Sequence, residues 1–135
     1  MADRLHSAAI HLLRRLRRQD AASGEGPARL SALSVLVFGG AKTLGELAAA
    51  EQVRPPTMSR IVAGLKRSGL VTIKADRNDA RRMRIQASSK GIALLQKARE
   101  RRIADLAAQL EHASVEELAT IDRAVEILRR VLENW

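Results

Sequence analysis

The 135-residue sequence predicts a mainly α-helical fold with one small β-hairpin. Three observations support this class. Apolar residues recur at helical spacing over most of the chain, short capping patterns divide it into separate helices, and the spacing changes to strict alternation at residues 71–73 and 83–86. The length suits a single domain, 1–135, that can bury a hydrophobic core.

Two helices are predicted in the N-terminal part of the chain. Leu5, Ala9, Leu12 and Leu16 form one apolar stripe with arginines on the other faces, and the glycine- and proline-containing segment AASGEGPA ends this helix. The segment RLSALSVLVF then predicts a short helix that is apolar enough to be buried, and GGAK ends it.

Two further short helices follow, each with a recognisable start. Thr43 and Glu46 form a T-x-x-E capping box, which opens the first of them. Pro55 and Pro56 would break the middle of a helix, but they fit its first turn, where their missing N–H groups would have no intrahelical partner. They therefore mark the start of the second helix, and Gly69 fits its C-terminal stop.

The C-terminal half begins with a predicted hairpin and continues with two long helices. Val71 to Lys74 and Arg82 to Gln86 alternate apolar and polar residues, and the charged segment ADRNDARR joins these two strands. Ser88 is the expected cap of the first long helix, and Ser114 with Glu117 forms a capping box for the second. The apolar stripe of the last helix comprises Leu118, Ile121, Val125, Leu128 and Leu132.

The charge balance indicates a polyanionic partner. The chain has 24 Lys and Arg against 15 Asp and Glu, a net charge of +9. Nucleic acid is the first expectation and an anionic membrane surface the second. Phe38 and Trp135 are the only aromatic residues, so there is no platform for stacking unpaired bases, and duplex DNA is the better target.

Other function classes find little support in the composition. The absence of cysteine excludes disulfides, thiolate metal sites and cysteine redox switches, and no histidine or carboxylate spacing indicates a metal site. No nucleophile, base and orienting group form a recognisable catalytic arrangement, so we expect no enzyme and no cofactor. The N-terminus lacks a signal peptide, and the longest uncharged run, 30–41, is too short to cross a bilayer. We expect a soluble, cytoplasmic protein that does not engage a membrane.

Two short helices followed by a basic hairpin have the layout of a winged helix-turn-helix. On a helical wheel Met58, Ile61, Val62 and Leu65 face the core. The opposite face is small and basic, as a helix entering the major groove tip first requires, and an arginine there can form a bidentate pair with guanine. The exposed face comprises Pro56, Ser59, Arg60, Ala63 and Arg67, and the expected phosphate contacts on its flanks are Thr43, Thr57 and Lys66.

The hairpin tip is also basic. Arg77, Arg81 and Arg82 could enter a neighbouring minor groove, where A·T tracts concentrate negative potential. We expect Asp79 to accept hydrogen bonds within the hairpin and hold an arginine in place. Taken singly, a solvated hairpin tip or a proline-capped surface helix would also explain these patterns. The order of the elements favours the DNA-binding interpretation.

Four segments together resemble the MarR family of bacterial transcription regulators. They are the helix-turn-helix TLGELAAAEQVRPPTMSRIVAGLKRSGLV, the D-x-R pattern Asp79-Ala80-Arg81 of the wing, the entry ASSKGIALL into the long helix, and RLSALSVL. The resemblance implies a homodimer in which 1–20 and 88–135 form a helical dimerisation region and 29–87 form the winged helix-turn-helix. It assigns recognition positions to Arg54, Pro56, Thr57, Ser59 and Arg60. The apolar stripes expected at the dimer interface comprise Leu5, Leu12, Leu16, Leu118, Ile121, Val125, Leu128 and Leu132.

The resemblance also implies repression at a palindromic operator, relieved by a small, often aromatic, anion bound between the two regions. By family pattern Arg81 enters the minor groove and Asp79 braces it. Ser34 stands where many relatives have glutamine, and the usual aromatic lining is missing, so the family's effector contacts do not transfer. Two alternatives stay open at this point: a nonspecific architectural DNA-binding protein, and a dimeric interaction protein that does not read DNA.

Overall fold

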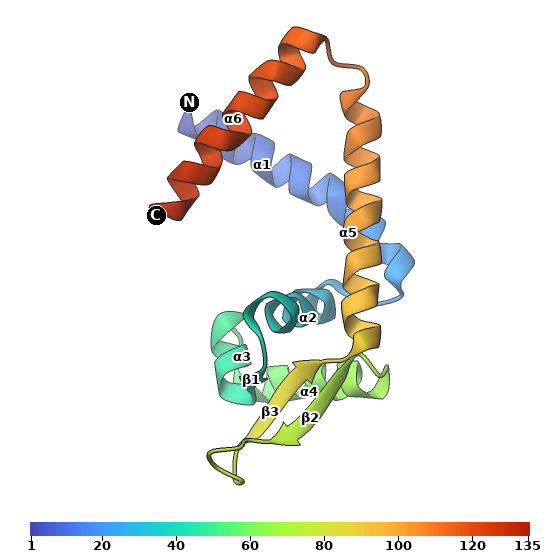
Figure 1. Ribbon diagram of the computed structural model, residues 1–135, viewed down its shortest axis with the longest axis vertical. Coiled ribbons are helices and arrows are strands. Elements are labelled where there is room, and N and C mark those ends of the chain that lie inside the picture. The colour runs from blue at the N-terminus through green and yellow to red at the C-terminus, as the bar shows by residue number, and fades with distance from the viewer.

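The computed structural model describes all 135 residues and confirms a mainly helical fold with a small antiparallel sheet (Figure 1). Six α-helices, one 3-10 helix and three short strands follow one another along the chain. Their bounds are α1 Ala2–Leu16, η1 Arg17–Ser23, α2 Pro27–Gly39, β1 Lys42–Thr43, α3 Leu44–Ala50, α4 Pro55–Arg67, β2 Val71–Ala75, β3 Met83–Ala87, α5 Ser89–Leu110 and α6 Val115–Glu133.

The core lies at one end of the molecule, where α2, α3, α4 and the sheet pack together (Figure 1). Helix α5 leads away from this end toward α1 and α6, and the loop between β2 and β3 projects on the opposite side. Both chain termini lie at the α1 and α6 end. The largest fully buried side chains are Leu33, Leu47, Met58, Leu65 and Leu70, which come from α2, α3, α4 and the turn after α4.

The sheet has three strands in the order β1-β3-β2, all antiparallel, whereas the sequence predicts only the hairpin of β2 and β3. Strand β1 has two residues, too few for a recognisable alternation, and it forms because Lys42 and Thr43 pair with Ile85 and Arg84. In β3, Ile85 is buried while Met83 is half exposed. Met83 pairs with Ala75 at the loop end of the hairpin, beyond the core.

The N-terminal helical segment is longer than predicted. Helix α1 ends at Leu16, but η1 continues through the predicted start of the loop as far as Ser23, and Gly24 then adopts a left-handed φ of 76°. Asp20, in η1, accepts a 2.7 Å hydrogen bond from Arg102 Nε of α5. This contact joins residues 82 positions apart, and no local pattern in the sequence could indicate it.

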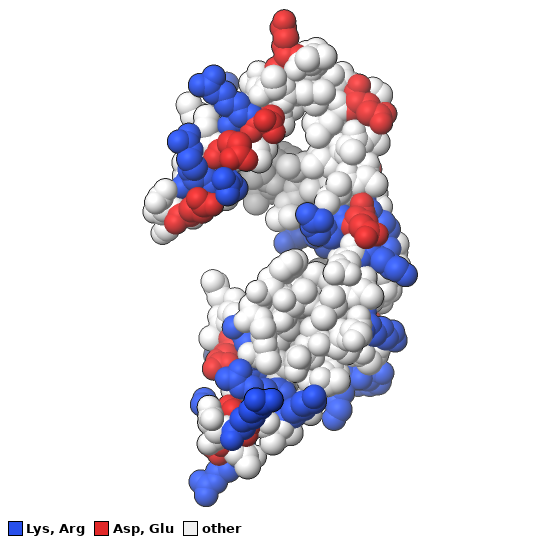
Figure 2. All heavy atoms as spheres, in the orientation of Figure 1, with Lys and Arg blue, Asp and Glu red and all other residues white.

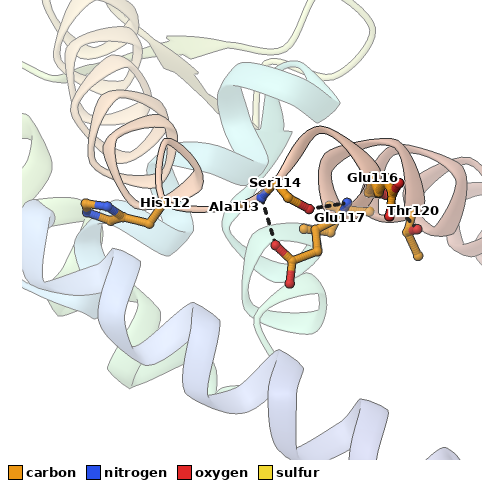
Figure 3. A pocket seen from close by; sticks show the side chains of 7 residues that line it. His112, Ala113, Ser114, Glu116, Glu117 and Thr120 are labelled. Carbon is orange, nitrogen blue, oxygen red and sulfur yellow. Dashed lines mark hydrogen bonds between the residues drawn. The ribbon is translucent and has the colours of Figure 1, made fainter.

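The predicted helix starts and stop are confirmed. The Ser114 hydroxyl accepts from the Glu117 N–H at 3.2 Å, and the Glu117 carboxylate accepts from the Ser114 N–H at 2.8 Å (Figure 3). The Ser88 hydroxyl accepts from Gly91 N–H at 3.1 Å and so caps α5. At the end of α4, Gly69 has φ 72°, the conformation that glycine adopts most easily after a helix.

Helices α1 and α6 contain no buried residue, although each has an apolar stripe. Leu5 and Leu12 of α1 are 45% and 47% exposed, and Val125 and Leu132 of α6 are 53% and 63% exposed. The single chain therefore leaves most residues of these stripes about half exposed. No helix is both long and apolar enough to span a membrane.

Candidate nucleic-acid interface

Helix α4 begins at the two prolines, as predicted. Arg54 is the N-cap in extended conformation, Pro55 and Pro56 occupy the first two helical positions, and no side chain caps this end. Thr57 is the third helical residue, and its N–H is one of the groups that a helix cannot pair within itself. The tip of α4 thus presents a free N–H and the positive end of the helix dipole to solvent.

The two faces of α4 are divided as the helical wheel predicts. Met58, Val62 and Leu65 are buried against the core, and Ile61 is partly buried beside it. The opposite face lies in solvent along its whole length. The exposed residues of α4 and its cap include Arg54, Pro56, Thr57, Ser59, Arg60, Ala63, Lys66 and Arg67. Lys66 and Arg67 lie in the last turn, about 15 Å along the helix from Pro56.

Thr43 differs from the other predicted contact residues. Its side chain is 9% exposed, and its hydroxyl accepts the Glu46 N–H at 3.3 Å while Glu46 accepts the Thr43 N–H at 2.9 Å. The Thr43 N–H is also the first cause of the lowered pKa of Glu46. In the cap the Thr43 hydroxyl acts only as an acceptor, so its O–H is still able to donate to a phosphate. The phosphate contact of Thr43 stays a prediction.

The wing, residues 76–82 between β2 and β3, exposes Arg77, Arg81 and Arg82. Asp79 Oδ1 accepts a 3.0 Å hydrogen bond from the Arg81 main-chain N–H. Asp79 therefore fixes the backbone at Arg81, as expected of a hydrogen-bond acceptor within the hairpin, but it forms no ion pair with a guanidinium group. Lys and Arg side chains gather over this end of the molecule, whereas α6 has a mixture of acidic and basic side chains (Figure 2).

Sequence reasoning missed the ion pair at the base of the wing. Arg84 Nε donates to Asp76 Oδ2 at 3.3 Å, and Arg84 Nη1 donates to the Ala41 carbonyl at 3.0 Å. Hydrogen bonds from Asn78 N–H and then Arg84 hold the pKa of Asp76 below its usual value. The sequence did contain a signal for this pair: an acidic residue follows the first predicted strand, and an arginine lies near the start of the second.

The end of α4 is attached to the start of α5. Lys90 Nζ donates to the Ser68 carbonyl at 2.8 Å, and the Ser88 hydroxyl donates to the Gly69 carbonyl at 2.6 Å. A Cβ atom at Gly91 would collide with the Leu70 carbonyl oxygen, so glycine permits this close approach. Together these contacts fix the orientation of α4 relative to α5.

A second contact on α4 comes from α2. The guanidinium group of Arg29 lies where a side chain at Gly64 would otherwise stand, and Glu25 holds it with a 3.1 Å hydrogen bond. Gly64 is buried in the middle of α4. The small residue therefore lets α2 and its arginine reach the helix backbone.

Several hollows lie outside this interface, and two of them are relevant to the predicted function. One, of about 450 Å³, lies between α1, η1, α2 and α5 and is lined by Leu16, Arg17, Asp20, Ser34 and Arg102, among others. The second is an open hollow at the turn between α5 and α6, where Figure 3 shows the Ser114 and Glu117 capping box. No group of three or more His, Cys, Asp or Glu residues could hold a metal ion.

Comparison with known proteins gives a consistent result. The MarR family model matches residues 24–82. The chain is 37% identical to an HTH-type transcriptional regulator of Mycobacterium bovis, covering 96% of this chain and 85% of the relative, and 31% identical to one of Mycobacterium leprae, covering 99% and 94%. These names indicate regulation of transcription rather than catalysis.

Solved structures agree with the sequence relatives. A MarR family protein from Bacillus stearothermophilus superimposes with a TM-score of 0.80 at 28% identity, covering 98% of this chain and 92% of that one. A transcriptional regulator from Pseudomonas aeruginosa gives 0.83 at 31% identity, covering 97% and 92%. The chain belongs to the MarR family of winged helix-turn-helix, DNA-binding transcription regulators.

Proposed function

We propose that the protein is a homodimeric repressor that binds a pseudo-palindromic operator in double-stranded DNA. One observation supports this most directly: the uncapped tip of α4 exposes Arg54, Pro56, Thr57, Ser59 and Arg60 together, at the same end of the molecule as the basic wing. The proposal assigns DNA binding to residues 29–87 and dimerisation to 1–20 and 88–135.

The exposed face of α4 has the chemistry to read the major groove. Ser59 and Ala63 are small, so the helix backbone can approach the base edges closely. Arg60 is exposed and forms no ion pair, which leaves its planar group free for a bidentate pair with guanine. Thr57 offers a hydroxyl and an N–H to a phosphate, which fixes register without reading sequence.

The wing supplies the second proposed contact with DNA. Arg77, Arg81 and Arg82 are exposed and form no ion pair. An arginine in a narrow minor groove senses groove width, and through it A·T content, at positions that α4 does not touch. In this role Asp79 sets the direction of Arg81 through the main chain.

Dimerisation is supported by the uncovered stripes of α1 and α6. Ile121 is 41% exposed and Leu132 63% exposed, so a partner could bury a large part of each. Covering half of such a side chain contributes about 1 kcal/mol. The stripes assigned to the interface comprise Leu5, Leu12, Leu16, Leu118, Ile121, Val125, Leu128 and Leu132.

Sedimentation at micromolar concentration tests the dimer. Ile121→Asp should shift the protein to monomer, because it places a charge in the stripe. Val115→Asp is the matched control: Val115 is 83% exposed at the start of α6 and outside the stripe, so this variant should sediment as the wild type does. A monomeric wild type would contradict the proposal.

Selection of binding sites from random duplex DNA tests sequence recognition. We expect a palindrome with half-sites about 10 base pairs apart, bound roughly a thousandfold more tightly than a scrambled control at the same salt concentration. Steeply salt-dependent binding with no enriched motif would instead indicate the architectural protein. Little salt-dependent binding would indicate an interaction protein of the same fold.

The 450 Å³ hollow supports regulation by a small anion. Arg17 lines it and forms no ion pair, while Arg102 is already paired with Asp20. An anionic effector bound there would contact α1, α2 and α5 at once. Titration of the operator complex with small aromatic carboxylates should release DNA from the wild type and less readily from Arg17→Gln.

A promoter reporter tests the direction of regulation. It should show lower transcription when the protein is present; higher transcription would identify an activator.

A further inference from the structure

We propose that Arg84 is a positioning residue that clamps the wing to the body of the DNA-binding region, and that the wing arginines reach DNA in register with α4 only while this clamp is closed. The inference rests on the proposed function for its DNA readout. Its geometry is independent of that function, because it concerns contacts within one chain.

Arg84 occupies the centre of the sheet. Strand β3 is the middle strand, and Arg84 pairs with Thr43 of β1 on one side and with Lys74 of β2 on the other. Its guanidinium group reaches the wing at Asp76 and the Ala41 carbonyl, which lies just before β1 and the cap of α3. A single side chain therefore connects the first residue of the wing to the segment that leads into the helix-turn-helix.

Asp76 transmits this contact to the rest of the wing. Its side chain is only 10% exposed, and its second oxygen accepts the Asn78 N–H at 3.1 Å. The Asp76 N–H donates to the Arg82 carbonyl at 2.8 Å, which closes the base of the loop. Apart from the contact with Arg84, the hydrogen bonds of residues 76–82 join wing residues to one another.

The wing projects beyond the sheet, so its direction depends on its base (Figure 1). Without the clamp, the loop would be attached only through the ends of β2 and β3, at the pair formed by Ala75 and Met83. A charged hydrogen bond at the base of a projecting loop restricts its swing. The hydrogen bonds from the Asn78 N–H and then from Arg84 lower the pKa of Asp76, as expected of a carboxylate held by two donors.

Two variants separate the clamp from simple charge effects. Arg84→Met removes the donors and one positive charge, while Asp76→Ala removes the acceptor and one negative charge. Electrostatic attraction to DNA alone predicts opposite changes in affinity. The clamp predicts that both variants weaken binding to the selected operator, each by about fivefold, the effect of losing one hydrogen bond. Opposite changes would overturn the proposal.

A double-mutant cycle tests whether Arg84 acts through the wing. Arg81→Ala should weaken operator binding in the wild type by about tenfold and in the Arg84→Met background by about threefold or less, because an unclamped wing has already lost part of its contact. Lys74→Met is the matched control: Lys74 lies opposite Arg84, is exposed, and forms no ion pair. In that background Arg81→Ala should keep its full effect. Additive effects with Arg84→Met would refute a positioning role.

Hydrogen exchange of the free protein tests the clamp without DNA. Amide exchange in residues 76–82 should be about fivefold faster in Arg84→Met than in the wild type, and unchanged in Lys74→Met. Equal exchange in all three proteins would overturn the clamp. If no operator is selected but exchange rises as expected, the clamp stands and the proposed function fails.

Discussion

Replacing Gly91 by alanine would place a methyl group where the first turn of α5 meets the Leu70 carbonyl oxygen. The nearest neighbour is backbone, so it cannot rotate away, and the Leu33 side chain lies 3.1 Å from the same point. The Leu70 carbonyl also accepts the Ser88 N–H at 2.9 Å, a bond that a shift of α5 would weaken. The junction between α4 and α5 must therefore open.

Three terms determine how much Gly91→Ala changes the free energy of unfolding. Overpacking costs about 1–3 kcal/mol, and the weakened Ser88 bond costs up to about 1 kcal/mol. Alanine is better than glycine inside a helix by about 1 kcal/mol. Together these terms predict that Gly91→Ala lowers the free energy of unfolding by up to about 3 kcal/mol. Urea unfolding at one fixed chain concentration measures it, because assembly makes stability depend on concentration.

Gly45→Ala is the control for the helix term. Gly45 lies in α3, and a Cβ atom there would meet nothing within 4 Å. This variant should be more stable than the wild type by about 0.5–1 kcal/mol. If Gly91→Ala proved as stable as Gly45→Ala, the close approach of α5 to Leu70 would not exist in solution, and the reasoning about the junction would be refuted.

Two further predictions concern the interface, and a third concerns the capping box of α3. Arg60→Ala should lower operator affinity by about 1–3 kcal/mol and relax base preference at one position of each half-site, which repeated site selection measures. Arg123→Ala of α6 is the control for the lost charge. An equal loss of affinity on all DNA sequences would make Arg60 a phosphate contact. Arg81→Ala should weaken binding more at A·T-rich than at G·C-rich flanks, and equal weakening would argue against the minor groove. The hydrogen bond from the Thr43 N–H, aided by nearby positive charges, lowers the pKa of Glu46 below its ordinary 4.5. The contribution of Glu46 to stability is therefore present above that pH and is lost as the pH falls through the lowered value. Glu46→Gln should flatten this part of the profile of unfolding free energy against pH, and an unchanged profile would contradict the capping box.

Features fixed by neighbouring residues could be predicted from the sequence. The capping boxes of Thr43 and Ser114, the prolines of α4 and the stop at Gly69 each depend on groups within about one helical turn. The faces of α4 followed from its periodicity, because one side must pack on the core. These local rules established the order of the elements.

Features that depend on distant pairing could not be predicted. Strand β1 forms only because it pairs with β3, and Arg84 donates a hydrogen bond to Ala41, which lies 43 positions earlier in the sequence. Thr43 combines both kinds of feature. Its cap with Glu46 is local and was predicted, whereas its burial, with only 9% of the residue exposed, depends on the elements packed around α3.

The attachment of α4 to α5 has a geometric consequence. Helix α5 has 22 residues, a length of about 33 Å at 1.5 Å per residue. With its N-terminal end joined to the end of α4 by Lys90 and Ser88, α5 would carry α4 with it if it tilted. A rotation of about 10° about its far end would carry α4 by about 6 Å, nearly twice the rise of roughly 3.4 Å per base pair. A small tilt at the α1 and α6 end would thus move α4 by more than the rise of one base pair.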